Sequence, residues 1–168
     1  AVPFLEGEPL KENERERYFA PPVSSQSASV YEHCARAIDR SLAAGAHGLP
    51  LMGGGDWNDG MNEVGAGGKG ESVWLAWFLH ANLDRFIPFA EARADAARVA
   101  SWRERLATLM QAVDGEGWDG DWYRRAFYDD GTPLGSAANE ECRIDAIAQS
   151  WAVLSGGGDP DRARRAMN

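Results

Sequence analysis

Residues 71–87 read ESVWLAWFLHANLDRFI, and this stretch decides the fold. Its apolar residues cover most of the circumference of a helix: Val73, Trp74, Leu75, Trp77, Phe78, Leu79, Leu83 and Phe86. A helix that is apolar nearly all round is buried on most of its sides. The stretch therefore predicts the inner helix of a protein built from more than one layer of helices.

A second helix is predicted directly after the first. Pro88 suits the first turn of a helix, where its missing N–H would have no partner in any case. Gly115 is expected to end this helix. Its apolar residues form a single stripe, as in an outer helix: Val99, Trp102, Leu106, Leu109, Met110 and Val113. An inner and an outer helix joined by a short link form an α-hairpin, the unit of an α/α toroid. The predicted fold class is therefore mainly α.

The N-terminal part of the chain differs from the rest. Four prolines within residues 1–28 disfavour a helix there, so this segment is expected to be an extended arm. Ser29 and Glu32 then form a capping box, which predicts that a helix begins at Ser29. Its apolar stripe continues to Leu42, and Gly45 is a suitable end. We expect two parts, an arm at 1–28 and a helical domain at 29–168.

Towards the C-terminus, residues 118–135 are short, aromatic and interrupted by turn residues, which predicts a small β-hairpin or an extended loop. A helix is expected over 143–155. Asp159 and Pro160 have the N-cap and N1 preferences that begin another helix. Because that helix is cut off at Asn168, we read the chain as a fragment of a longer protein.

Composition excludes several classes of partner. The net charge of −9 leaves no basic excess for nucleic acid or an anionic membrane. No apolar run is long enough to span a bilayer, so no transmembrane helix is expected. The two cysteines, Cys34 and Cys142, are interpreted as free thiols in a reducing compartment, which predicts a cytoplasmic location.

The candidate site is the glycine-rich loop at residues 48–62. Asp56, Asn58, Asp59 and Asn62 surround Trp57 there, beside flexible glycine backbone. A flat apolar ring next to hydrogen-bonding groups is a common way to hold a sugar. The alternative is an Asx-rich turn held by its own backbone hydrogen bonds.

Two other ligands are excluded for this region. A phosphate loop needs Gly-Lys followed by Ser or Thr, but Lys69 is followed by Gly70. A calcium loop that began at Asp56 would place Gly60 where a ligand is required and would lack Glu at its twelfth position. No metal site and no nucleotide cofactor are therefore predicted.

The carboxyl groups of the loop suit glycoside chemistry. Inverting cleavage by water needs two carboxyl groups, one as acid and one as base. If the nucleophile is phosphate, which is already an anion, one protonated acid is enough. Asp56 and Asp59 are close enough in sequence to raise each other's pKa by repulsion, and Trp57 could add desolvation. On this chemistry alone the two aspartates are equivalent.

Three motifs carry a resemblance to a known family. They are Gly45-Ala46-His47-Gly48-Leu49-Pro50-Leu51-Met52, Gly55-Asp56-Trp57-Asn58-Asp59-Gly60-Met61-Asn62 and Gly70-Glu71-Ser72-Val73-Trp74-Leu75. The chain resembles family 94 of the glycoside hydrolases, the inverting phosphorylases of β-linked disaccharides. Within it, segments such as 119–126 and 141–151 look most like the C-terminal phosphorylase-like region of cyclic β-1,2-glucan synthetases.

The resemblance implies part of an (α/α)₆ barrel. It implies Asp59 as the general acid and Trp57 as a residue of the adjoining sugar subsite. Asp56 and Asn58 are candidates for sugar binding or for shaping the loop, and Glu71 is expected to support the start of a helix. Glu141, Arg143 and Gln149 are placed near the border of the cleft.

The resemblance also implies partners. They are a β-glucan oligosaccharide, with β-1,2-glucan expected, and inorganic phosphate as co-substrate without a cofactor. The phosphate-binding Arg, His and Thr residues of the family would lie outside this chain. The parent would be a bacterial inner-membrane protein with this region on the cytoplasmic side.

Two alternatives remain open at this stage. One is an inverting hydrolase that uses water and a second carboxylate, Asp121 or Glu141. The other is a non-catalytic glucan-binding fragment, which would follow from the missing phosphate ligands. In either case, inner-helix surface exposed at the ends of an incomplete barrel would favour self-association.

Overall fold

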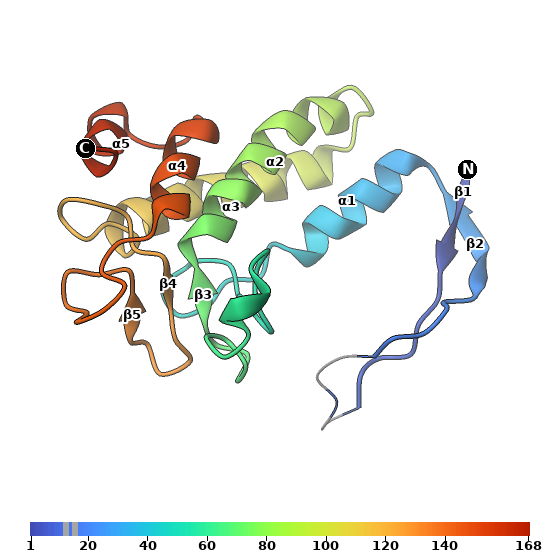
Figure 1. The fold of residues 1–168 in the computed structure, drawn as a ribbon. Helices are drawn as coiled ribbons and strands as arrows, with labels where there is room; N and C mark the ends of the chain where they lie inside the picture. Colours follow the sequence, from blue (N-terminus) through green and yellow to red (C-terminus); the bar gives the residue numbers. More distant parts are fainter. Residues whose placement is uncertain (12–13, 15–16) are drawn as a thin grey trace. The chain divides into compact units, whose positions relative to one another are not determined.

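The computed structural model describes residues 1–11, 14 and 17–168, in two compact units. The first unit is Ala1–Arg40 and the second is Ser41–Asn168 (Figure 1). Residues 12, 13, 15 and 16 of the predicted arm lie outside the described part. The division predicted at residue 28 stays a prediction.

In the first unit, the expected extended segment is a two-stranded antiparallel ribbon. Strand β1 (Val2–Leu5) pairs with β2 (Val23–Ala28), and the register shifts between Pro3 and Leu5. Helix α1 (Val30–Arg40) follows. The ring of Phe4 in β1 stacks on His33 of α1 with centroids 4.0 Å apart. The ribbon therefore packs on the helix that follows it.

The hydroxyl half of the capping box predicted for α1 is confirmed. The hydroxyl of Ser29 accepts a hydrogen bond from the Glu32 amide at 3.2 Å. The helix ends at Arg40, however, so the prediction that it continues to Gly45 is wrong. Residues after Arg40 form turns, and the amide of Gly45 instead donates to the carbonyl of Leu49 at 2.9 Å.

Helix α2 (Val73–Glu91) is the inner helix that the sequence predicts. Nine of its residues are buried: Val73, Trp74, Ala76, Trp77, Leu79, Ala81, Leu83, Ile87 and Ala90. Ser72 caps it by accepting a hydrogen bond from the Leu75 amide at 3.1 Å. The prediction that Pro88 begins the next helix is wrong, because Pro88 lies inside the last turn of α2. A proline so near the end removes a single backbone hydrogen bond, so the helix can continue past it.

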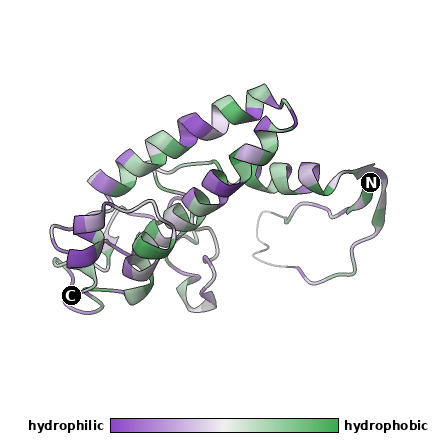
Figure 2. Cartoon of the chain, turned by 90° about the horizontal axis from the view of Figure 1, so that it is seen from above, coloured by the Kyte–Doolittle hydropathy of each residue, from purple (hydrophilic) through white to green (hydrophobic). Residues whose placement is uncertain are grey.

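Helix α3 (Ala96–Gly115) packs against α2 and is the outer partner of the pair. It buries three residues, Trp102, Leu109 and Val113, against nine in α2. Figure 2 shows hydrophilic and hydrophobic residues mixed along these paired helices. Asp95 caps α3 by accepting a hydrogen bond from the Arg98 amide. The α-hairpin expected from the sequence is therefore present.

A small three-stranded antiparallel sheet lies at the beginning of α2 (Figure 1). Its strands are β3 (Glu71–Ser72), β4 (Ala126–Phe127) and β5 (Pro133–Leu134), in that order. The β4–β5 pair confirms the hairpin predicted within 118–135. The sequence did not indicate β3, which joins this hairpin to the N-terminus of the inner helix.

Two helices complete the second unit. Helix α4 (Ala146–Leu154) begins later than predicted, because the side chain of Asp145 caps it by accepting from the Ile147 amide at 2.8 Å. Helix α5 (Pro160–Ala166) begins as expected, with Asp159 as its N-cap. Both cysteines are free. Among the described residues, no helix has the length and apolar character needed to cross a bilayer.

The link between α2 and α3 generates a prediction. Ala94 has a φ of 55°, a left-handed conformation that disfavours any residue with a Cβ atom. The substitution Ala94→Gly relieves about 1–2 kcal/mol of strain and adds about 0.5–1 kcal/mol of chain entropy to be lost on folding. The free energy of unfolding should therefore rise by about 0.5–1 kcal/mol, measured by urea denaturation. Ala92 is a matched control, because its φ of −62° is right-handed. Ala92→Gly should not stabilise, and an equal gain for both variants would contradict the prediction.

Candidate active site

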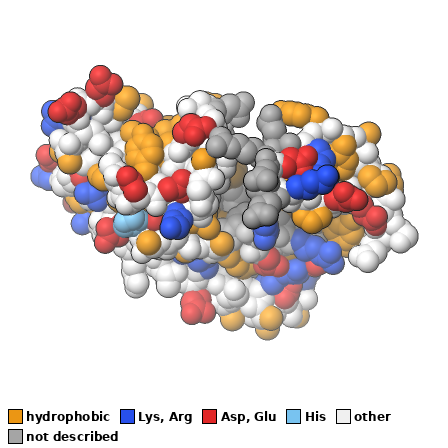
Figure 3. Space-filling view, turned by 90° about the horizontal axis from the view of Figure 1, so that it is seen from below, with side chains coloured by type: hydrophobic (Ala, Val, Ile, Leu, Met, Phe, Trp, Pro, Cys, Tyr) orange, Lys and Arg blue, Asp and Glu red, His pale blue; other side chains and the backbone are white. Residues whose placement is uncertain are grey.

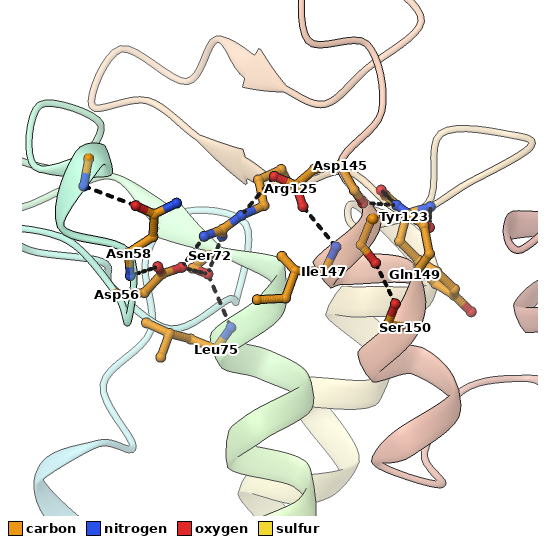
Figure 4. Close-up of polar contacts among 12 residues, drawn as sticks. Asp56, Asn58, Ser72, Leu75, Tyr123, Arg125, Asp145, Ile147, Gln149 and Ser150 are labelled. Carbon is orange, nitrogen blue, oxygen red and sulfur yellow. Dashed lines mark hydrogen bonds and ion pairs between the residues drawn. The ribbon is translucent and has the colours of Figure 1, made fainter.

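The loop that carries the candidate residues is fixed to the sheet at its beginning. The amide of Ser72 donates to the carbonyl of Pro50 at 3.0 Å, and the amide of Met52 donates to the carbonyl of Gly70 at 2.8 Å. These bonds hold the chain along β3. The polar residues that follow therefore lie next to the N-terminus of α2 (Figure 4).

The side chain of Asp56 is buried, and both of its carboxylate oxygens have partners. Its side chain is 0% exposed and forms an ion pair with Arg125, with Oδ2 and Nη2 2.6 Å apart. The same oxygen accepts from the Ser72 hydroxyl at 3.0 Å, and Oδ1 accepts from the Asn58 amide at 3.1 Å. These contacts support the loop-shaping role for Asp56 over direct contact with a sugar.

Asn58 and Asp59 form a turn beyond this anchor. The side chain of Asn58 accepts from the Gly60 amide at 3.0 Å and caps the 3₁₀ helix η1 (Asp59–Met61). Asp59 is the first residue of that helix, and its side chain lies outside what the structure describes. The backbone on both sides of Asp59 is thus held by hydrogen bonds that lead back to Asp56.

Trp57 is the exposed aromatic residue of the loop. The residue is 62% exposed, so a flat face is open to a ligand. Its ring lies 6.4 Å from that of Trp74, which in turn stacks on Phe78 and meets Trp151 edge-on. Trp57 is therefore the outermost ring of a group of aromatic side chains that also includes Trp74, Phe78 and Trp151.

Arg125 is a buried residue of the candidate site that the sequence does not single out. Its side chain is 1% exposed and reaches three segments: it pairs with Asp56, donates to the Ser72 hydroxyl at 3.1 Å and lies 3.5 Å from a carboxylate oxygen of Asp145 (Figure 4). A charged residue directly before the apolar strand residues Ala126 and Phe127 was the available signal.

Glu71 fixes the segment before the loop. Its buried carboxylate accepts hydrogen bonds from the His47 amide at 3.1 Å and the Leu49 amide at 3.0 Å, and it contacts His47 Nδ1 at 2.5 Å. The His47 ring also stacks on Phe127, with centroids 3.9 Å apart. Glu71 and His47 are therefore occupied by contacts that hold the fold.

The remaining sequence candidates are placed elsewhere. Asp121 is exposed and lies 3.5 Å from Arg165. Glu141 and Arg143 are exposed, whereas Gln149 is buried and bonds both the amide and the carbonyl of Tyr123, at 2.8 and 2.7 Å. Gln149 thus ties α4 to the segment before β4.

The family is decided by comparison with known proteins. The model of the glycosyl hydrolase 94 superfamily catalytic domain matches residues 2–168. The chain belongs to this family. It is 56% identical, over 99% of its length, to cyclic beta-(1,2)-glucan synthase NdvB of Rhizobium meliloti. It is 42% identical over 79% of its length to 3-O-beta-D-glucopyranosyl-beta-D-glucuronide phosphorylase, and 37% over 88% to solabiose phosphorylase, both from Paenibacillus borealis.

The chain is short beside these relatives. It spans 6% of the glucan synthase, 17% of the glucuronide phosphorylase and 19% of the solabiose phosphorylase. Phosphorylases of this family take inorganic phosphate as co-substrate and need no cofactor. The resemblance inferred from the three sequence motifs is therefore confirmed at the level of the family.

Close packing at Gly45 gives a prediction for this region. A Cβ atom on Gly45 would lie 2.4 Å from Cδ of the buried Glu71. Gly45→Ala should therefore lower the free energy of unfolding by about 1–3 kcal/mol, measured by urea denaturation. Gly115 at the end of α3 is the control, since nothing lies within 4 Å of its Cβ position. Gly115→Ala should be neutral or stabilising, and a harmless Gly45→Ala would contradict the packing.

Asp129 gives a prediction about pH. Its carboxylate accepts hydrogen bonds from the amides of Gly67, Lys69 and Gly70, which lower its pKa. A lowered pKa in the folded state means that the carboxylate stabilises the fold above its ordinary pKa. The contribution is lost as the pH falls through the folded-state value. The free energy of unfolding of Asp129→Asn should be lower than that of wild type near neutral pH. The difference between the two proteins should shrink as the pH falls. Urea denaturation between about pH 7 and pH 3 measures this, and a gap that persists or widens in acid would refute it.

Proposed function

We propose that this chain supplies the proton-donating part of an inverting phosphorylase site for β-linked glucosides, with β-1,2-glucan as the substrate class. The observation that carries the proposal is the arrangement of the loop. Asp56 is buried on Arg125, while the turn at Asp59 lies beside the exposed Trp57. Two of the relatives are named phosphorylases, which supports phosphorolysis as the proposed reaction. The 56% identity to a cyclic beta-(1,2)-glucan synthase supports β-1,2-glucan as the proposed substrate class.

The reaction follows from one acid and an anionic nucleophile. A phosphate oxygen attacks the anomeric carbon from the face opposite the leaving sugar, and the glycosidic C–O bond breaks. Asp59 gives its proton to the departing oxygen, so the products are a sugar 1-phosphate of inverted configuration and a shortened glucan. No protein base is required, because phosphate needs no deprotonation by a carboxylate.

Binding is shared between this chain and the rest of the protein. Trp57 offers its exposed face to the sugar ring, and Asn58 holds the turn that presents Asp59. The residues that hold phosphate are proposed to lie outside this chain. On the face shown in Figure 3, Lys and Arg side chains are interspersed with Asp and Glu. This distribution and the net charge of −9 disfavour nucleic acid as a partner.

The α-hairpin is proposed to be one part of an (α/α)₆ barrel. Apolar residues of α2 and α4 remain exposed, with Phe78 at 43%, Val153 at 53% and Leu154 at 64%. Further helices of the whole protein would cover such residues, and the chain alone would tend to self-associate through them. The parent is proposed to hold this region on the cytoplasmic side of a membrane.

The proposal is tested by Asp59→Asn in the whole protein that contains this chain. Release of sugar 1-phosphate from a β-1,2-linked gluco-oligosaccharide should fall by about 10²–10⁴-fold, the usual contribution of a positioned acid. Thermal unfolding of wild type and variant shows whether the fold is kept. Undiminished release from the variant would sink the assignment of Asp59.

Asp121→Asn is the matched control. If phosphate is the nucleophile, this variant keeps its rate, and wild type without phosphate releases no free sugar. If water is the nucleophile and Asp121 the base, the variant loses activity and wild type works without phosphate. A protein that binds the oligosaccharide but cleaves it under neither condition would favour the non-catalytic alternative.

A further inference from the structure

We propose that Arg125 is the positioning residue for the general acid of this site. The inference rests on the proposed role of Asp59, and it assigns a role to a side chain that lies 66 positions further along the chain. Arg125 itself need not contact the substrate. It acts through Asp56, which it faces in Figure 4. Asp56 also contacts the turn where Asp59 begins η1.

The backbone of Arg125 is fixed first. Its amide donates to the carbonyl of Leu134 at 2.8 Å, and its carbonyl accepts from the Val73 amide at 3.1 Å. Gly135 packs so closely that a Cβ atom there would lie 2.8 Å from the backbone nitrogen of Arg125. The guanidinium therefore extends from the sheet rather than from a free loop.

The guanidinium then fixes Asp56. Its Nη2 lies 2.6 Å from Asp56 Oδ2, and its Nη1 donates to the Ser72 hydroxyl at 3.1 Å. That hydroxyl donates to the same Asp56 oxygen at 3.0 Å and caps α2 through the Leu75 amide. Asp56 Oδ2 is thus held by an ion pair with Arg125 and by a hydrogen bond from Ser72, and both partners lie in or directly beside the small sheet.

The other oxygen of Asp56 passes this constraint to the acid. Oδ1 accepts from the Asn58 amide at 3.1 Å, and the Asn58 side chain accepts from the Gly60 amide at 3.0 Å. Asp59 lies between these two residues. The hydrogen bonds run without a gap from the sheet to both neighbours of Asp59, within a loop that is otherwise rich in glycine.

This geometry predicts that loss of Arg125 slows only those reactions in which Asp59 must give a proton to the leaving group. A displaced acid slows departure of a sugar alkoxide, whereas fluoride leaves without protonation. A displacement of about 1 Å can lower a rate by about 100-fold. Arg125→Met should therefore lower kcat on a β-1,2-linked gluco-oligosaccharide by about 10–100-fold while kcat on β-glucosyl fluoride stays within about 3-fold of wild type.

The experiment measures kcat and KM for both substrates, with phosphate, in the whole protein. Arg124→Met is the matched control, since Arg124 is the adjacent residue and pairs with a different carboxylate, Asp119, at 2.6 Å. Any change in kcat for this control variant should be the same for both substrates. Arg125→Lys keeps the positive charge, so its kcat on the gluco-oligosaccharide should lie between the values for wild type and Arg125→Met.

Asp56→Asn breaks the same link from its other end and serves if Arg125→Met does not fold. It should reproduce the leaving-group dependence, and the double variant should be no worse than the poorer single variant. The positioning role would be overturned if the Arg125 and Asp56 variants lowered kcat equally on the gluco-oligosaccharide and on β-glucosyl fluoride. If Asp59→Asn itself lacks the leaving-group dependence, the proposed function fails first, so the two failures are distinguishable.

Discussion

The buried contact between Arg125 and Asp56 is the interaction on which the rest of the site depends. Both side chains are enclosed, at 1% and 0% exposed, so neither charge can be satisfied by water. Removing one partner of such a pair leaves the other uncompensated and costs about 3–5 kcal/mol. Because Arg125 also reaches Ser72 and Asp145, this contact brings together the loop and the first turns of α2 and α4.

This contact also separates the roles of two aspartates that the sequence presents as equivalents. Asp56 is committed to Arg125, Ser72 and Asn58 through both of its oxygens. Such a carboxylate has little left to offer a substrate. The proposed acid, Asp59, lies further along, on the turn that begins the 3₁₀ helix η1.

Local signals predicted helices well and long-range contacts poorly. The periodicity of residues 71–87 and the cap at Asp159 depend only on neighbours in sequence, and the structure contains both features. Pro88 was misread because a proline preference at one helix start does not reveal where the previous helix ends. Arg125 was missed because its partner Asp56 lies 69 positions away, and no periodicity marks such a pair.

The short strand β3 explains why two separate sequence motifs act as one unit. Glu71 and Ser72 are consecutive, so their side chains point to opposite faces of the strand, and both are buried. Glu71 holds the His47 and Leu49 amides before the loop, whereas Ser72 holds Asp56 within it. Both anchors are carried by the two residues that precede the inner helix. The segment from Leu49 to Asp56, which contains three glycines, is therefore positioned at both of its ends by residues at the N-terminus of α2.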